Sequence, residues 1–182
     1  MYGMIHQAAR KMAIESMGEA RWRDILAEIG FDEEHFISAR HYDDAATFAL
    51  VGAVSKASGI AMDPLLEAFG RYWIGFAAAS SYGRMLDMAG ETFEELIESL
   101  DRMHASIKST MPEANMPGFE VIGSNGATME LRYSSDRTGL NSFVIGLLKG
   151  LMDRFGEAGE ITPRAASDGG VVFSIAREMR AA

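Results

Sequence analysis

Two groups of side chains in this sequence could do chemistry together. His104 lies among apolar residues spaced three and four apart, so its imidazole should point into the protein interior. The run Tyr133-Ser134-Ser135-Asp136-Arg137 follows later in the chain. If this run is extended, its alternate residues share one face, and phenol, hydroxyl and guanidinium can converge on an anion. The predicted chemistry is metal ligation by the imidazole and carboxylate binding by the three donors.

Iron porphyrin is a ligand that would use both groups, because imidazole can ligate its iron and its two propionates need donors. The chain has no cysteine, which excludes a disulfide, a thiolate-ligated haem, the usual iron–sulfur cluster and a cysteine nucleophile. We therefore predict His104 as the metal ligand and haem b as the cofactor.

Each group also has an ordinary structural explanation. A single inward histidine is often a core residue that hydrogen-bonds to the backbone. The Tyr, Ser and Arg side chains could simply face water at the end of a strand. The other three histidines show no metal-ligand spacing with one another and are predicted to be surface residues: His6, His35 and His41.

The first half of the chain reads as a series of helices. Apolar spacing predicts helices over 4–17, 20–29, 43–59 and 82–89, and Gly18 should end the first of them. Another helix should run through Phe76, with Asp63 as its N-cap and Pro64 in its first turn. Thr92 and Glu95 can form a capping box for the helix that carries His104. Pro112 and Pro117 should end that helix.

In the second half of the chain, the spacing of apolar residues changes from helical to a mixture of strand and helix. Strands are predicted over Phe119–Ser124 and Ala127–Tyr133, around the hairpin turn Asn125-Gly126. A helix should follow over 140–155, and then a hairpin over 160–162 and 171–177 with a turn at Ser167-Asp168-Gly169-Gly170. The prediction is one α+β domain over 1–182, with a helical N-terminal lobe (about 1–62), a C-terminal lobe of antiparallel sheet and helices (about 63–182), and the cofactor buried between them.

Charge and hydropathy exclude some classes of partner. The net charge is −9, without a cluster of Lys or Arg, which argues against nucleic acid. No apolar run approaches the roughly 18 residues of a membrane span, so we expect no membrane insertion. The start Met1-Tyr2-Gly3-Met4 lacks the blocks of a secretion signal, so we expect a cytoplasmic protein.

One protein family has counterparts of five stretches of this chain: Met1-Tyr2-Gly3, Phe69-Gly70-Arg71-Tyr72-Trp73, Leu100-Asp101-Arg102-Met103-His104, the Tyr-x-Ser-x-Arg motif and Gly146-Leu147-Leu148-Lys149-Gly150. Together they resemble the H-NOX (haem nitric oxide/oxygen binding) family, over essentially the whole chain. This family includes bacterial gas sensors and the haem domain of the β subunit of soluble guanylate cyclase.

The resemblance implies roles for individual residues. His104 matches the proximal iron ligand, and Tyr133, Ser135 and Arg137 match the residues that hold the propionates. Three more matches would contact the porphyrin: Pro117, which presses on it and helps distort it, Ile5, which packs on its distal side, and Leu147 of the matched glycine-flanked stretch. Pro117 could also merely end a helix and Ile5 merely fill a core.

The distal residues bear on the choice of gas. In oxygen-binding H-NOX proteins a tyrosine donates to the bound gas, and its place falls here on Phe143, which offers no hydrogen bond. The resemblance therefore implies binding of NO and CO without a stable O₂ complex. A shift of one residue would put Ser142 there instead. Trp73 also matches a distal position and carries one N–H donor, although it could simply be core.

The implied mechanism is a switch: NO weakens the bond between iron and His104, and the two lobes shift. Since the chain ends at Ala182 without a visible catalytic domain, we expect the response from a partner, such as a histidine kinase or a cyclic-di-GMP enzyme. An oxygen-binding H-NOX variant is one alternative. Others are a haem enzyme such as a peroxidase, for which His6 and Arg10 are the distal acid–base candidates, and an interaction module without cofactor.

Overall fold

The computed structural model describes residues 1–167 and 169–179. Its elements are α1 (Gly3–Ile29), the short 3₁₀ helix η1 (Glu33–Phe36), α2 (Asp44–Ser58), α3 (Met62–Ala78), α4 (Gly83–Met88), α5 (Phe93–Thr110), β1 (Gly118–Ser124), β2 (Thr128–Ser134), α6 (Asn141–Arg154), β3 (Glu157–Ala165) and β4 (Val171–Met179). The predicted α+β fold is confirmed. Asp168, in the last predicted turn, lies outside the described residues.

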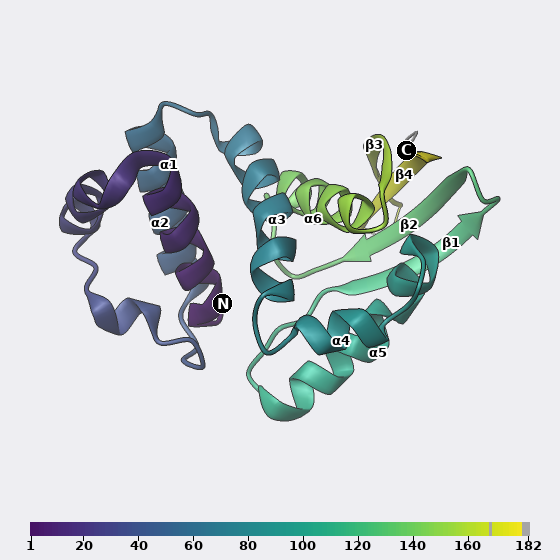
Figure 1. The fold of residues 1–182 in the computed structure, drawn as a ribbon, viewed down its shortest axis with the longest axis horizontal. Coiled ribbons are helices and arrows are strands. Elements are labelled where there is room, and N and C mark those ends of the chain that lie inside the picture. Colours follow the sequence, from purple (N-terminus) through teal and green to yellow (C-terminus); the bar gives the residue numbers. More distant parts are fainter. Residues whose placement is uncertain (168, 180–182) are drawn as a thin grey trace.

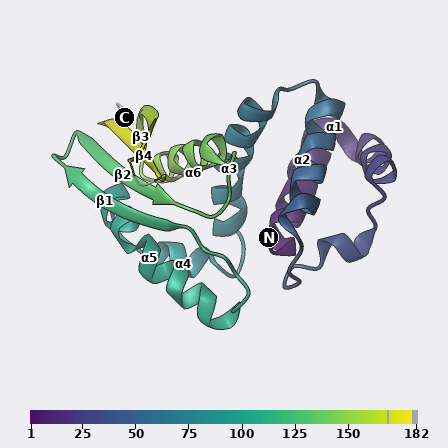
Figure 2. The same cartoon turned by 180° about the vertical axis from the view of Figure 1, so that it is seen from behind.

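The molecule has a helical part and a sheet part. Figure 1 shows α1 and α2 side by side on one side of the molecule, and the sheet with α4, α5 and α6 on the other, with α3 between them. The view from behind in Figure 2 shows the same separation. One hydrophobic core fills the helical part and another lies under the sheet. Helix α3 contributes to both, because Phe69 belongs to the first core and Ile74 to the second, while Trp73 packs against both.

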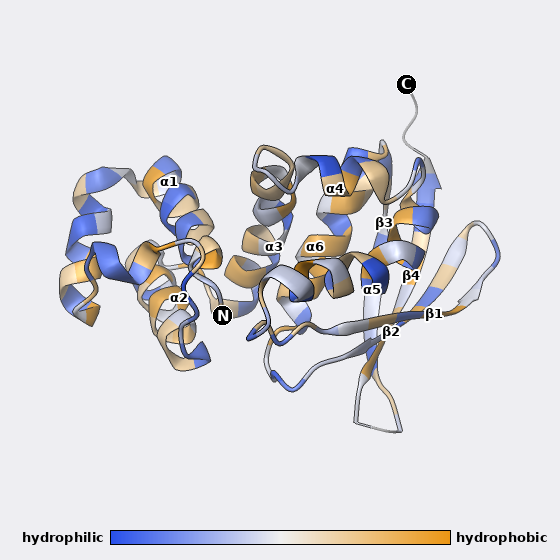
Figure 3. Ribbon diagram, turned by 90° about the horizontal axis from the view of Figure 1, so that it is seen from below, coloured by the Kyte–Doolittle hydropathy of each residue, from blue (hydrophilic) through white to orange (hydrophobic). Residues whose placement is uncertain are grey.

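The sheet is antiparallel, with strand order β1-β2-β4-β3. The predicted Asn-Gly turn joins β1 to β2, and Gly126 has the positive φ of 86° that such a turn requires. Phe119 pairs with Tyr133 across the two strands. Apolar residues gather along α3 and α6, whereas the outer end of α1 is largely hydrophilic (Figure 3).

Helices α3 and α6 lie very close together because both carry glycine at their contact. A Cβ atom on Gly70 would lie 2.1 Å from the carbonyl oxygen of Phe143, and one on Gly146 would lie 2.0 Å from the carbonyl oxygen of Glu67. Only glycine allows this approach of two backbones. The contact fixes the start of α6, and with it Phe143, against α3.

The predicted stop at Gly18 is confirmed, because its φ of 81° and ψ of 161° are not helical and divide α1 into two helical segments across a kink. One predicted helix boundary needs correction. Helix α3 begins at Met62, so Asp63 is not its N-cap. The Asp63 carboxylate instead accepts a hydrogen bond of 3.1 Å from the Ser142 hydroxyl, which makes it a contact to α6 rather than a cap. Pro64 does lie in the first turn.

The prediction that all three remaining histidines are surface residues is wrong for His6, which is fully buried. Its Nδ1 donates to the His35 carbonyl at 2.7 Å, and its Nε2 accepts from the Thr47 hydroxyl at 2.8 Å. Because both ring nitrogens have partners, the imidazole can be buried among aromatic rings. His35 is partly exposed in the cap of η1, and His41 is exposed.

Within residues 1–167 and 169–179, no single helix is long and apolar enough to cross a membrane. One pair of helices, Asp44–Ser58 and Met62–Ala78, passes that test only when taken together, and the two are bent by 110°.

Candidate functional site

A cavity of about 270 Å³ lies where the helical part meets α3, α5, α6 and the sheet. Its wall is mostly apolar. All of the site residues predicted from the sequence line this one cavity: Ile5, Trp73, His104, Pro117, Tyr133, Ser135, Arg137, Phe143 and Leu147. Residues far apart in the chain thus converge on one space large enough to hold a ligand.

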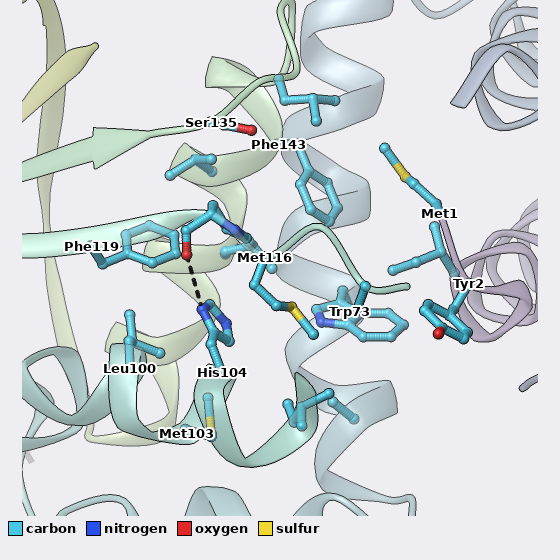
Figure 4. Close-up of a pocket in the computed structure, with 18 of the residues that line it drawn as sticks. Met1, Tyr2, Trp73, Leu100, Met103, His104, Met116, Phe119, Ser135 and Phe143 are labelled. Atoms are coloured by element: carbon cyan, nitrogen blue, oxygen red, sulfur yellow. Dashed lines mark hydrogen bonds between the residues drawn. The ribbon is translucent and has the colours of Figure 1, made fainter. Parts of the chain in front are cut away.

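His104 points into the cavity from α5 (Figure 4). Its Nδ1 lies 3.3 Å from the backbone carbonyl oxygen of Pro117. Since a carbonyl oxygen can only accept, Nδ1 carries the hydrogen and the lone pair of the neutral ring is on Nε2. Burial lowers the pKa of His104, and the raising effects of the Pro117 carbonyl and of Asp101 do not outweigh it. The imidazole is therefore neutral near pH 7, as metal ligation requires.

The N-terminal half of α5 is firmly anchored. The predicted capping box forms only in part. The Thr92 hydroxyl accepts from the Glu95 backbone N–H at 3.2 Å, but the Glu95 carboxylate accepts from the Glu91 N–H rather than from that of Thr92. Phe93, Leu96 and other apolar side chains of this half are buried in the core under the sheet. Beyond Leu100 the helix is more exposed. His104 thus lies just past the anchored half of its helix.

Three donors lie at another edge of the cavity. Tyr133 is buried at the end of β2, where its ring centroid lies 5.3 Å from that of Phe119. Strand β2 ends at Ser134 and a bend at Asp136 follows, so only the first part of the run lies in a strand. Beyond the strand, the Ser135 hydroxyl accepts from the Arg137 backbone N–H at 3.1 Å, which leaves its own hydrogen free to donate. All three side chains still line the same cavity.

Arg137 connects the two parts of the molecule. Its Nε donates to the Asp44 carboxylate of α2 at 2.7 Å, and its Nη1 donates to the Asn115 carbonyl at 2.7 Å. The N-terminal ammonium of Met1 also binds Asp44, at 2.9 Å. A guanidinium has five N–H donors, so others remain for a ligand carboxylate. Sequence reasoning missed Asp44, whose one visible signal was an acid at a helix start.

The opposite wall comes from α1, α3 and the start of α6. The ring of Phe143 lies 5.4 Å from that of Phe69. Tyr2 and His41, which sequence reasoning missed, also line the cavity, and their rings meet edge to face at 5.5 Å. They pair through an isolated β-bridge that no local pattern reveals. Met116 was missed as well; its flexible thioether lies between His104 and Trp73 (Figure 4).

These residues fit haem. The imidazole presents a free Nε2, the cavity walls are apolar as a porphyrin ring requires, and Tyr133, Ser135 and Arg137 gather donors at one edge. The fold and the site together fit a haem-binding domain, with the cavity between the helical part and the sheet part of the molecule.

Comparison with known proteins gives the same class. A model of the family described as Haem-NO-binding matches residues 2–162. The chain belongs to this haem-binding family, whose solved members are H-NOX proteins. The predicted family and cofactor are confirmed.

Curated relatives are soluble guanylate cyclases. Soluble guanylate cyclase gcy-32 of Caenorhabditis elegans is 27% identical over 157 residues, which cover 85% of this chain and 23% of that protein. Soluble guanylate cyclase 89Db of Drosophila melanogaster is 23% identical over 155 residues, with coverage of 85% and 23%. The chain therefore spans about a quarter of the length of these relatives.

Solved structures share the whole fold. The H-NOX protein from S. oneidensis in the Fe(II)NO state has a TM-score of 0.86 and 21% identity, with 98% of this chain and 99% of that chain covered. An oxygen-binding H-NOX domain, solved as its oxygen complex, has a TM-score of 0.80 and 18% identity, with coverage of 100% and 96%. Structures described with NO and with oxygen thus have the same architecture, so the fold alone does not select the gas.

Proposed function

We propose that this haem-binding, gas-binding domain is a sensor of nitric oxide that also binds CO and forms no stable O₂ complex. The observation that carries the proposal is the position of Phe143 in the cavity wall, fixed against α3 by the close contact at Gly70. When bound, haem supplies a ferrous iron that can coordinate a diatomic gas.

The residues around the cavity would divide the work of holding haem. His104 would ligate the iron through Nε2, with its ring orientation set by the Pro117 carbonyl. Tyr133, Ser135 and Arg137 would bind the propionates. Ile5 and Leu147 would pack against the ring with Pro117, and Trp73 and Phe143 would complete the wall.

The choice of gas follows from hydrogen bonding. Bound O₂ takes on negative charge and is stabilised by a donor, whereas NO and CO depend much less on one. Phe143 provides no donor. The same wall contains donors on Tyr2, Trp73 and His41, and these support the rival function of an oxygen-binding domain.

Absorbance spectra of the reduced protein under argon, air, CO and NO test the proposal. We expect the spectrum under air to match that under argon before oxidation, and CO and NO each to shift the Soret band. Phe143→Tyr should create a donor and a stable oxygen spectrum, whereas the matched control Phe143→Leu should not. A stable oxygen spectrum of the unsubstituted protein would contradict the proposal and favour the oxygen-binding alternative.

We further propose that the response passes through α5 to a partner, such as a histidine kinase or a cyclic-di-GMP enzyme. Support comes from the anchoring of α5, whose first half is buried while the half with His104 is more exposed. If a bound gas weakened the bond between the haem iron and His104, the more exposed half of α5 would therefore be the part free to move. The peroxidase alternative is disfavoured, because His6 and Arg10, both among the described residues, do not line the cavity.

A further inference from the structure

Arg177 of β4 is a buried charged side chain at the start of the helix that carries His104. Its side chain is only 8% exposed. Its Nη2 donates to the Glu94 carboxylate of α5 at 3.2 Å and to the Gly126 carbonyl at 2.8 Å. Its Nη1 donates to the Glu157 carboxylate of β3 at 3.5 Å. One guanidinium thus joins α5, the turn between β1 and β2, and the strand β3.

The first turn of α5 has further contacts with this group. The guanidinium carbon of Arg177 lies 5.3 Å from the centre of the ring of Phe93, the first residue of α5, which is a cation–π distance. Hydrogen bonds from Ser124 and Arg177 lower the pKa of Glu94 more than burial raises it, so this carboxylate is charged near pH 7. The Arg177 backbone N–H donates to the Ala127 carbonyl at 2.8 Å, which holds the arginine itself in place.

These polar contacts differ in kind from the apolar packing of α5. Leu96, Ile97 and Leu100 are buried in the core under the sheet, but the hydrophobic effect is non-directional. Charge-assisted hydrogen bonds have a defined geometry, so they can fix the helix along its axis. A buried ion pair loses much of its attraction to desolvation and contributes little net stability. Positioning of α5 is therefore the role that best matches Arg177.

The helix connects this group of contacts to His104. Glu94 and His104 lie ten residues apart in α5, which is about 15 Å along the helix at roughly 1.5 Å per residue. The backbone hydrogen bonds of a helix resist a change in this spacing. A displacement of the first turn along the helix axis would therefore displace His104 as well.

A second set of contacts holds α5 beside the cavity. The Asp101 carboxylate accepts from the Phe119 N–H at 2.9 Å, and Nδ1 of His104 donates to the Pro117 carbonyl. Both bonds reach the short segment that leads into β1. The helix is thus held at two places, and Arg177 holds the end that is farther from His104.

We propose that Arg177 is a positioning residue for the iron ligand: by fixing the first turn of α5, it limits how far His104 can extend into the cavity. The proposal rests on the proposed function, since it takes His104 as the ligand. The contacts of Arg177 resist movement of α5 toward the iron and so keep the iron–histidine bond weak. Without them, α5 is free to move toward the iron, and the bond should strengthen.

Resonance Raman spectra of the reduced holoprotein under argon measure the frequency of the iron–histidine stretch, which labelling with ¹⁵N-histidine identifies. Glu94→Ala should raise this frequency, because it releases α5 while Arg177 stays paired with Glu157. Arg177→Met should shift the frequency in the same direction.

Glu95→Ala is the matched control. It removes the same charge from the same first turn, and with it the same favourable interaction with the helix dipole. The Glu95 carboxylate, however, accepts from the Glu91 N–H and not from Arg177. This variant should keep the frequency of the unsubstituted protein.

The proposal is overturned if Glu94→Ala has the frequency of the unsubstituted protein, or if Glu95→Ala shifts it equally. The Glu94 side chain is 33% exposed, so Glu94→Ala decides the question even if Arg177→Met does not fold. Failure of the proposed function is distinct, because it shows in the equilibrium spectra under air and NO. Normal spectra with an iron–histidine band that Glu94→Ala leaves unmoved would reject the role of Arg177 alone.

Discussion

At the scale of single residues, the two ways in which this protein uses histidine differ in whether a ring nitrogen is left free. His104 has one nitrogen on the Pro117 carbonyl and the other toward a cavity. His6 has both nitrogens satisfied, by His35 and Thr47. Both are inward, but only the first can ligate a metal. Hydrogen-bond partners, rather than burial, separate a ligand histidine from a core histidine.

Replacing His104 by glycine should remove the iron ligand. We expect loss of haem or of the normal ferrous spectrum, restored in part when imidazole is added, because free imidazole can occupy the vacated space. Absorbance spectra of the purified variants check this. His41→Gly is the matched control, since His41 also lines the cavity. If His104→Gly had the parent spectrum in every gas, His104 would not be the ligand.

His6 should make stability depend on pH. Burial lowers its pKa, more than the hydrogen bond to the His35 carbonyl raises it. The folded protein therefore holds His6 neutral, while the unfolded chain takes up a proton near the ordinary value of 6.5. The stability that His6 contributes is fully present above that value and is lost as the pH falls below it.

Thermal unfolding across this pH range measures the effect. His6→Gln should flatten the fall of Tm below pH 6.5, whereas Thr47→Val should lower Tm with little change in its pH slope, because it removes a hydrogen bond without removing the titrating group. An unchanged slope in His6→Gln would show that His6 is not the responsible group.

At the scale of elements, the contact between α3 and α6 sets the distal wall. Gly70 and Gly146 let the two backbones approach, and the approach holds Phe143 against Phe69. The apolar spacing predicted both helices, and Gly146 belongs to a stretch that carries the resemblance to the family. Neither the helical period nor the match revealed that a Cβ here would strike a carbonyl of the other helix.

Gly146→Ala should destabilise the protein strongly. The new Cβ would lie 2.0 Å from the carbonyl oxygen of Glu67, so one of the two helices must move. We expect the free energy of unfolding to fall by at least the usual overpacking loss of about 1–3 kcal/mol. Gly75→Ala in α3 is the control, since its Cβ would meet nothing within 4 Å. Relief of glycine's entropy cost should stabilise that variant by about 0.5–1 kcal/mol. Denaturant unfolding of both variants measures the change in the free energy of unfolding, which should fall for Gly146→Ala and rise for Gly75→Ala. Equal changes in the two variants would contradict the packing argument.

At the scale of the whole molecule, Asp44 ties the helical lobe to the predicted propionate site. Its carboxylate binds Arg137 and the N-terminal ammonium at once. Burial pushes the pKa of Asp44 up, but the hydrogen bonds from Arg137 and the ammonium outweigh it and lower the pKa. The carboxylate is thus charged throughout the neutral range, and its contribution is lost only as the pH falls from 3.8 through the lowered value.

Asp44→Asn should loosen this connection. We expect faster amide hydrogen exchange near the N-terminus and at Tyr42, whose N–H donates to the Met1 carbonyl at 2.7 Å. Asp43→Asn is the matched control, because it removes the same charge next to the start of α2, where Asp43 makes no side-chain capping bond. Equal exchange in the two variants would mean that the link to Arg137 does not hold the lobes together.

The sequence by itself determined the main helices and strands, the fold class and the family, although not the short helix η1. Periodicity, caps and turn dipeptides act within a few residues, so they can be read from neighbours along the chain. The motifs and the family resemblance predicted the site residues, and all of these residues line one cavity. His104 is an example, because its helix, its cap and its inward face are all local properties.

Only the tertiary structure decided what lies between those elements. The pairing of Tyr2 with His41, the link from Arg137 to Asp44 and the contact of Arg177 with Glu94 all join segments that are distant in the chain. His6 was misassigned for the same reason, since its partners His35 and Thr47 lie on other elements. Such contacts depend on how helices pack and on which polar groups find one another. They form only when distant segments of the chain come together in the folded protein, so no local sequence pattern predicts them.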